Sequence, residues 1–256
     1  MKTISLFTLF FFAASFSKPV PTTYIFWGDS IMAGNELNHW GSDGPNNIHL
    51  RWPKQYAEGI KGGYELSNAQ SGATLCSNWG GNGPFETRLS QVENYNPLQT
   101  NLIFIGYGFN DMSRAMGPPY NFSLSQFHAI FISKLTNAIQ YIKSNKGWPA
   151  EKIVIVWNYV VNNPPYSITQ ANWEATLTAI RNVVTSEGVS ILDFHSFWKN
   201  RSDKDNYTDG DLIHPNESAN TIMAANVDAL IEYPSAGGGN PPPGVIKVKG
   251  RKYVVY

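Results

Sequence analysis

The 256-residue sequence predicts an α/β fold in which a parallel sheet is covered by helices on both faces. Short runs rich in β-branched and aromatic residues alternate with longer stretches of helical period, which is the pattern of βαβ units. Two of these runs, around Ile103 and Ile155, are apolar almost without a break, as is typical of strands buried on both faces. With 42% hydrophobic residues, the chain can form a full hydrophobic core.

Five runs are predicted to be strands, and in chain order they cover residues 24–27, 64–68, 102–107, 153–158 and 190–194. Three amphipathic helices are predicted between and after them, each with one apolar stripe. Ser123 and Gln126 form a capping box before the first helix. The three stripes are Phe127, Phe131, Leu135, Ala138 and Ile142, then Trp173, Leu177, Ile180 and Val184, then Met223, Val227, Leu230 and Ile231.

The N-terminus has the features of a secretory signal peptide. A basic residue precedes an apolar run, and Ser15 and Ser17 have the spacing of a cleavage site. The run of about 13 residues is shorter than the roughly 20 that a membrane-spanning helix needs. We expect residues 1–17 to be removed, the mature protein to be secreted or extracytoplasmic, and no stable membrane association.

The C-terminal part changes in composition. A single globular domain is expected to cover residues 18–234, and the Gly- and Pro-rich residues 235–244 are typical of a linker. Residues 245–256 are predicted to form a short β-rich tail. Because an isolated hairpin is marginal in water, this tail is a candidate for docking onto another protein.

Charge and cysteine content exclude several classes of function. The chain has 19 basic and 19 acidic residues, so no general attraction to nucleic acid or to an anionic membrane is expected. Cys76 is the single cysteine, which rules out an intramolecular disulfide and favours a buried thiol over a nucleophile. The five histidines show no metal-ligand spacing, so no metal site is expected.

Two segments carry the residue types of nucleophilic catalysis. Ser30 follows the first strand in Gly-Asp-Ser, at the sheet edge where open α/β folds build their sites. His214 follows Asp211 by three residues, which suits an imidazole base oriented by a carboxylate. Asp209 is a reserve candidate for that carboxylate. A helix-cap or turn role is the alternative for Ser30, and a loop histidine without chemistry is the alternative for His214.

Two other strand ends offer hydrogen-bond donors for a developing oxyanion. Asn110 follows the third strand and contributes an amide, with a turn cap of its own backbone as the alternative. Its neighbour Asp111 is assigned to such a structural role. Gly72 follows the second strand, and its backbone N–H is a second candidate donor.

These segments, in this order, resemble the SGNH hydrolases, the GDSL-like esterase and lipase superfamily, across residues 24–231. Ile31 departs from the leucine of the eponymous motif, one apolar residue for another. The resemblance implies a flavodoxin-like three-layer fold of about five parallel strands. It also implies a Ser30–His214–Asp211 triad, an oxyanion hole made by the amides of Ser30 and Gly72 and the side chain of Asn110, and no cofactor.

The substrate is expected to be a short-chain ester of a small molecule or a glycan, and an acetyl ester of a carbohydrate is the first choice. No extended apolar stretch suitable for a long acyl chain is evident outside the predicted core elements. Trp40 and Trp79 are candidate sugar platforms, with packing as the alternative. A lysophospholipase or thioesterase, or a non-catalytic glycan-binding protein on this fold, are the competing functions.

Overall fold

Six strands form one mixed sheet with the order β2-β1-β3-β4-β5-β6 in the computed structural model, which describes residues 22–34, 49–160, 168–208 and 213–233. The strands are β1 (Thr23–Gly28), β2 (Tyr64–Ser67), β3 (Thr100–Gly106), β4 (Ile153–Trp157), β5 (Ser190–Asp193) and β6 (Ile231–Glu232). The first five run parallel, in the flavodoxin-like order 2-1-3-4-5. The predicted α/β fold and its five parallel strands are confirmed.

The three long predicted helices are present, and shorter ones join the remaining strands. The predicted helices are α5 (Leu124–Asn145), α6 (Gln170–Glu187) and α8 (Glu217–Leu230). A further helix, α4 (Phe109–Met116), follows β3. The shorter ones are α1 (Ser30–Ala33), α2 (Trp52–Lys54), η2 (Gln55–Ile60), η3 (Ser77–Trp79), α3 (Phe85–Arg88), η4 (Leu89–Gln91), η5 (Ala150–Lys152), α7 (Phe194–Lys199) and η7 (Lys204–Asn206). The predicted capping box is formed, because Ser123 and Gln126 bond each other's backbone N–H groups.

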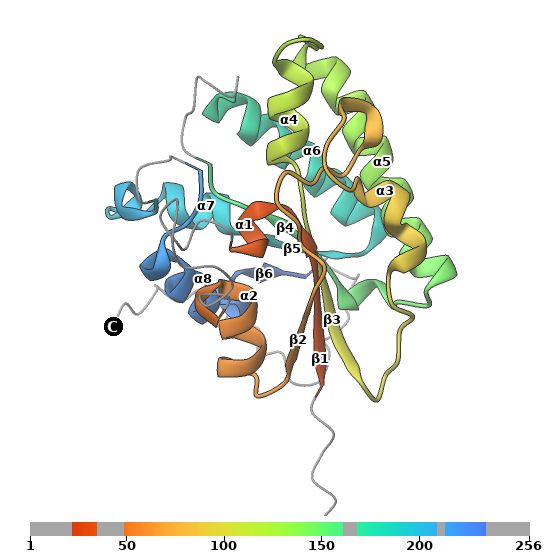
Figure 1. Cartoon of the computed structure of the whole chain (residues 1–256), viewed down its shortest axis with the longest axis vertical. Helices are drawn as coiled ribbons and strands as arrows, with labels where there is room; N and C mark the ends of the chain where they lie inside the picture. The colour runs from red at the N-terminus through yellow and green to blue at the C-terminus, as the bar shows by residue number, and fades with distance from the viewer. Residues whose placement is uncertain (1–21, 35–48, 161–167, 209–212, 234–256) are drawn as a thin grey trace, which may run out of the picture.

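The sheet separates two hydrophobic cores. Successive side chains of a strand point to opposite faces, so Ile103 and Ile105 pack with α5 and α6 while Phe104 packs with α2 and α8. Figure 1 shows α3, α5 and α6 on one side of the sheet and α2, α7 and α8 on the other. This two-sided burial explains why the central strands read as continuous apolar runs.

One element differs from the prediction. Ile231 is the last residue of the predicted third helical stripe, but α8 ends at Leu230 and Ile231 begins β6. There it pairs antiparallel with Leu192 of β5. The helical period does not distinguish these alternatives, because a buried apolar residue satisfies both a helix stripe and a sheet edge.

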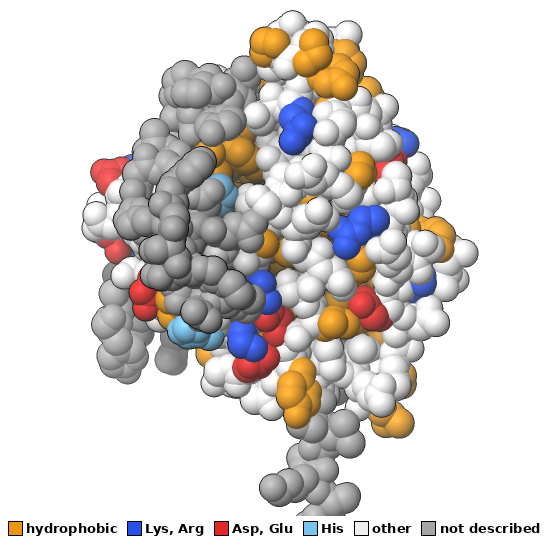
Figure 2. All heavy atoms as spheres, viewed as in Figure 1, with side chains coloured by type: hydrophobic (Ala, Val, Ile, Leu, Met, Phe, Trp, Pro, Cys, Tyr) orange, Lys and Arg blue, Asp and Glu red, His pale blue; other side chains and the backbone are white. Residues whose placement is uncertain are grey.

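The parallel strands place their carboxyl ends along one edge of the sheet, where Ser30 follows β1 and Gly108 follows β3. On the face shown in Figure 2, acidic and basic side chains are scattered without a large region of one sign. None of the helices in the described ranges has the length and apolar character needed to cross a membrane. The predicted signal peptide, linker and tail lie outside the described residues.

Candidate active site

Ser30 lies where β1 turns directly into α1. Asp29 is the N-cap of this helix, and its carboxylate accepts a hydrogen bond from the backbone N–H of Ile31 at 3.0 Å. Ser30 is the first helical residue and is only 6% exposed. The cap and the burial together fix the backbone that carries the serine hydroxyl at the carboxyl edge of the sheet.

Glycines at the strand ends allow α1 to lie close to the sheet. A Cβ added to Gly28 would lie 2.8 Å from the carbonyl oxygen of Gly106 and would overlap the side chain of Met32. A Cβ on Gly106 would overlap the same methionine. The glycine of Gly-Asp-Ser is therefore required by the close approach of Met32, which is two residues beyond the serine.

His214 reaches Ser30 from the other end of the chain. Its Nε2 atom lies 2.8 Å from the Oγ atom of Ser30, although the residues are 184 positions apart in sequence. The turn that carries the imidazole is held by Asn216, whose side chain caps α8 and whose backbone N–H donates to the Tyr207 carbonyl at 2.9 Å. An imidazole nitrogen thus lies within hydrogen-bond distance of a serine hydroxyl, which is the geometry that general-base catalysis requires.

The remaining predicted member of the triad, Asp211, lies outside the described residues, and so do its reserve, Asp209, and the predicted sugar platform Trp40. Their roles stay predictions. Among the residues that the structure places, no group of three or more His, Cys, Asp or Glu is arranged to hold a metal ion.

Asn110 and the Gly72 loop lie together. The Asn110 amide Nδ2 donates to the carbonyl oxygen of Ala73 at 3.1 Å, so the side chain reaches across to this loop and does not cap its own turn. Gly72 has a φ of +70°, and its carbonyl accepts from the Asn82 N–H. The predicted turn-cap alternative for Asn110 is therefore wrong, and the two predicted donor positions are neighbours.

Two backbone N–H groups at this edge make no hydrogen bond among the described residues. They belong to Ser30, at the first position of α1, and to Gly72. The first N–H groups of a helix have no partner within the helix, so Ser30 offers such a donor by its position. These are the two backbone donors that the sequence predicted for the oxyanion.

Trp79 is not a substrate platform in this structure. Its side chain is 2% exposed, packs edge-on against Phe122, and donates its indole Nε1–H to a carboxylate oxygen of Asp111 at 3.1 Å. Its ring faces are thus unavailable to a sugar, and the packing alternative is correct.

Two buried carboxyl groups lie beneath the site. Burial raises the pKa of Asp29 to about 7, although the Ile31 N–H and the charge of His214 act in the opposite direction. Burial also raises the pKa of Asp111 to about 6, and hydrogen bonds from Leu75, Cys76 and Trp79 limit that rise. Negative charge at Asp111 in turn raises the pKa of Asp29, so the two carboxyl groups influence each other.

Cys76 is a packing residue, as predicted. Its side chain is fully buried, and burial raises the pKa of the thiol far above its usual range. A thiol that stays protonated is a poor nucleophile.

Sequence reasoning missed Asn220, which supports His214 from inside α8. Its side-chain Nδ2 donates to the Pro215 carbonyl at 2.8 Å, and its Oδ1 accepts the Trp52 N–H at 2.9 Å. The residue is fully buried and connects α2 to the residue after the imidazole. A lone Asn in a helix gives no sequence signal for this role.

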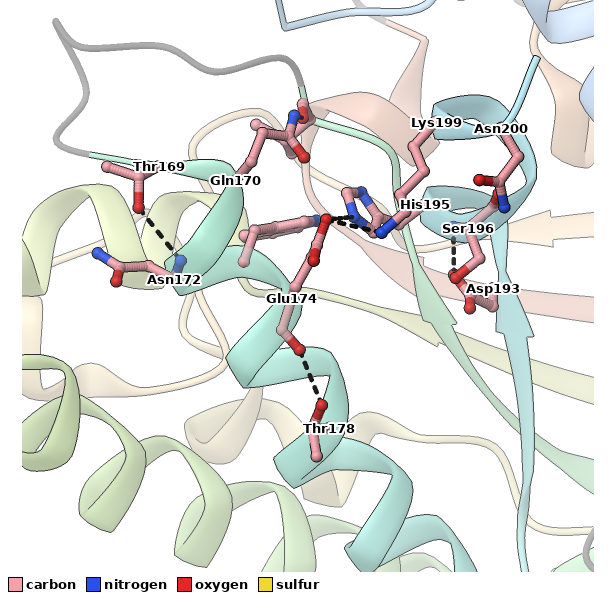
Figure 3. Close-up of polar contacts among 12 residues, drawn as sticks. Thr169, Gln170, Asn172, Glu174, Thr178, Asp193, His195, Ser196, Lys199 and Asn200 are labelled. Atoms are coloured by element: carbon pink, nitrogen blue, oxygen red, sulfur yellow. Dashed lines mark hydrogen bonds and ion pairs between the residues drawn. The ribbon is translucent and has the colours of Figure 1, made fainter.

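A second polar cluster lies at the carboxyl ends of β4 and β5. Figure 3 shows Glu174 of α6 pointing toward His195 and Lys199 of α7. The Glu174 carboxylate lies 2.8 Å from Lys199 Nζ and 3.7 Å from His195 Nε2. His195 is fully buried, and burial lowers the pKa of its ring. This cluster joins two helices and is separate from the Ser30–His214 pair.

The sequence profile of the GDSL-like Lipase/Acylhydrolase family matches residues 26–222, which is more than half of the chain. The chain belongs to this family. The resemblance drawn from the sequence is thus confirmed, and the protein is a serine hydrolase of ester bonds. Among curated protein sequences, none matches the chain significantly.

Several solved structures of hydrolases share the fold. A lipase/acylhydrolase from Enterococcus faecalis is 16% identical with a TM-score of 0.56, covering 80% of this chain and 92% of its own. The psychrotrophic esterase EstA from Pseudoalteromonas sp., inhibited by monoethylphosphonate, is 16% identical with a TM-score of 0.54, covering 82% and 96%. A carbohydrate esterase is 19% identical with a TM-score of 0.53, covering 80% and 66%.

Proposed function

We propose that this GDSL protein hydrolyses short-chain esters through a triad of Ser30, His214 and Asp211. The observation that carries the proposal is the 2.8 Å contact between His214 Nε2 and Ser30 Oγ. A serine hydroxyl becomes a useful nucleophile when an imidazole takes its proton, and a carboxylate that orients the imidazole completes the arrangement. Asp211, three residues before His214, is the carboxylate that we propose for this role.

In the proposed reaction, Ser30 Oγ attacks the ester carbonyl carbon while His214 Nε2 takes the hydroxyl proton. The tetrahedral intermediate collapses, and His214 returns the proton to the leaving alcohol. Water then attacks the acyl-enzyme with His214 again acting as the base, which releases the acid and the free serine. Each step uses groups of the chain and water alone.

The oxyanion is proposed to bind the N–H groups of Ser30 and Gly72 and the side chain of Asn110. Both backbone groups lack other partners in the described residues. The Asn110 amide carries two N–H bonds, and the contact with the Ala73 carbonyl uses one of them. The second N–H is the one that we assign to the oxyanion. Preorganised donors of this kind typically supply the largest electrostatic term in acyl transfer.

Acetyl esters of carbohydrates are the proposed substrates. The large apolar side chains exposed in the described residues are Ile60, Tyr64, Leu66, Leu98 and Tyr120, and none lies in the segments that form the site. This favours a short acyl group over a long one. The carbohydrate esterase among the structural neighbours supports the choice of alcohol. Neighbours named as lipolytic proteins support a lipid ester as the second candidate.

Replacement of Ser30 tests the reaction. Ser30→Ala should lower kcat for p-nitrophenyl acetate by roughly 10⁴-fold or more while the melting temperature stays close to that of the parent protein. A fluorophosphonate probe should label the parent and not the variant. Retained turnover in a folded variant would show that another group is the nucleophile, and an inactive parent would favour the non-catalytic binding function.

A substrate panel tests the second part of the proposal. Acetylated sugars, lysophospholipids, thioesters and nitrophenyl esters of increasing chain length should rank by kcat/KM with acetylated sugars first. A maximum at long acyl chains would favour the lysophospholipase or lipase alternative. We also propose export of the protein after removal of residues 1–17, which N-terminal sequencing of the secreted protein would test.

A further inference from the structure

The carboxylate of Asp111 holds the loop after β2 at three points. It accepts hydrogen bonds from the backbone N–H groups of Leu75 at 2.9 Å and Cys76 at 3.0 Å, and from the Trp79 indole at 3.1 Å. The side chain is fully buried in α4. Hydrogen bonds to a charged acceptor are stronger than neutral ones, so this carboxylate is a firm anchor for the loop.

The anchored segment carries one proposed oxyanion donor, the Gly72 N–H, and it binds a second one, the Asn110 amide. Ala73, two residues before Leu75, accepts the hydrogen bond from Asn110, and Gly72 precedes it directly. Asn110 and Asp111 are consecutive residues at the start of α4. One therefore binds a carbonyl of the loop and the other binds its N–H groups, so the loop and the helix start are fixed against each other.

We propose that Asp111 is a positioning residue for ester hydrolysis, whose carboxylate sets the placement of the Gly72 N–H relative to the Asn110 amide. This inference rests on the proposed function and assigns no contact with the substrate to Asp111. Oxyanion donors act at about 2.7–3.1 Å, and removal of one typically lowers kcat by 10²- to 10³-fold. Loosening the loop therefore weakens the hydrogen bonds that stabilise the oxyanion in the transition state.

The substitution Asp111→Asn breaks this anchor with almost no change in volume. One carboxylate oxygen accepts from Leu75, and the other accepts from both Cys76 and Trp79. Whichever way the new amide is turned, its NH₂ group faces at least one N–H donor. The loop must move away at that point, while Asn110 itself is retained.

A comparison of an ester with its thionoester tests the inference. A thiocarbonyl sulfur accepts hydrogen bonds weakly, so the oxygen ester gains more from the oxyanion hole than its sulfur analogue. In Asp111→Asn, kcat for the oxygen ester should fall by roughly tenfold or more with a smaller change in KM. The ratio of kcat/KM for the oxygen ester to that for the thionoester should fall with it. A loss of folded enzyme alone would lower both substrates equally.

Thr169→Ala is the matched control. Thr169 caps α6 by accepting the Asn172 N–H at 3.1 Å, so its loss lowers stability without touching the oxyanion loop. The ratio between the two substrates should be unchanged in this variant. If Asp111→Asn does not fold, Trp79→Phe removes one of the three donors and should lower the ratio by a smaller factor.

An unchanged ratio in folded Asp111→Asn, or in Trp79→Phe where that variant is needed, would overturn the inference while leaving the esterase function intact. An equal fall of the ratio in Thr169→Ala would also overturn it, since general destabilisation would then explain the effect. A parent protein that hydrolyses neither ester would instead overturn the proposed function, so the two failures are distinguishable.

Discussion

Asp29 combines two roles in a single residue, because it caps α1 and interacts electrostatically with His214. Its carboxylate is 1% exposed and accepts the Ile31 N–H. Burial disfavours the charged form, which raises the pKa of Asp29 to about 7 despite the attraction of His214. The folded state therefore binds a proton at Asp29 under conditions in which the unfolded chain has lost it.

This difference predicts a pH effect on stability that Asp29→Asn removes. The pKa of Asp29 rises from 3.8 to about 7 on folding, so its stabilising contribution is complete below pH 4 and is lost as the pH rises through 7. Asn still caps the helix but does not titrate. Relative to the parent, the variant should gain on the order of a few kcal/mol between pH 4 and pH 8.

Urea unfolding of both proteins across this pH range measures the difference. Asp203→Asn is the control, because Arg201 holds the pKa of Asp203 below its usual value at an exposed position. Its difference from the parent should show no such gain with rising pH. If the difference in unfolding free energy between Asp29→Asn and the parent did not change with pH, the pKa of Asp29 would not be raised by folding, which would contradict the prediction.

At the scale of one element, α1 depends on how closely it approaches the strand ends. Met32 packs over Gly28 and Gly106, where any Cβ would overlap it. The same packing sets the height of Ser30 above the sheet and hence its distance from His214. A short helix of four residues has little stability of its own, so the tertiary contact decides its position.

Gly28→Ala should therefore damage both stability and catalysis. The added methyl group overpacks the contact with Met32 and the Gly106 carbonyl, which typically costs about 1–3 kcal/mol. Displacement of α1 should also lower kcat by roughly tenfold or more, since small displacements of reacting groups strongly reduce the rate. Gly59→Ala is the control, because a Cβ there meets no atom within 4 Å. Equal effects in the two variants would contradict the close-packing explanation.

At the scale of the whole molecule, one arginine links the last described strand, β6, to the elements beside it. Arg181 of α6 contacts the Asp193 carboxylate at 2.6 Å and also pairs with Glu232 of β6. Asp193 ends β5, is almost fully buried, and caps α7 through the Ser196 N–H. A single guanidinium thus connects α6, β5 and β6 at the edge where the sheet is antiparallel.

Arg181→Met should destabilise the protein more than loss of the outer partner does. The substitution leaves the buried Asp193 carboxylate without its cation, which we expect to cost about 1–3 kcal/mol. Glu232→Gln removes an exposed partner and should cost less than about 1 kcal/mol. Denaturant unfolding of both variants gives the comparison. A larger effect for Glu232→Gln would show that the surface pair, and not the buried carboxylate, carries the stability.

Local pattern in the sequence was sufficient for most of the fold. The five parallel strands and the helix from Leu124 follow from apolar periods and a capping box, which are properties of neighbouring residues. β6 could not be predicted from the sequence, because it has only two residues, follows α8 directly and is too short to show a periodic pattern of apolar residues. Its strand character arises only from pairing with β5, across about forty positions of sequence.

The candidate site divides in the same way. Ser30, His214, Gly72 and Asn110 were predicted from residue types that follow strands or precede a helix, and parallel strands bring such positions to one edge. The sequence by itself thus determined the family, the chemistry and the residues to examine. Only the tertiary structure decided that His214 lies 2.8 Å from Ser30, that Trp79 faces inward, and that Asp111 holds the loop after β2. Burial and long-range contacts depend on the packing of the whole chain, which no local pattern encodes.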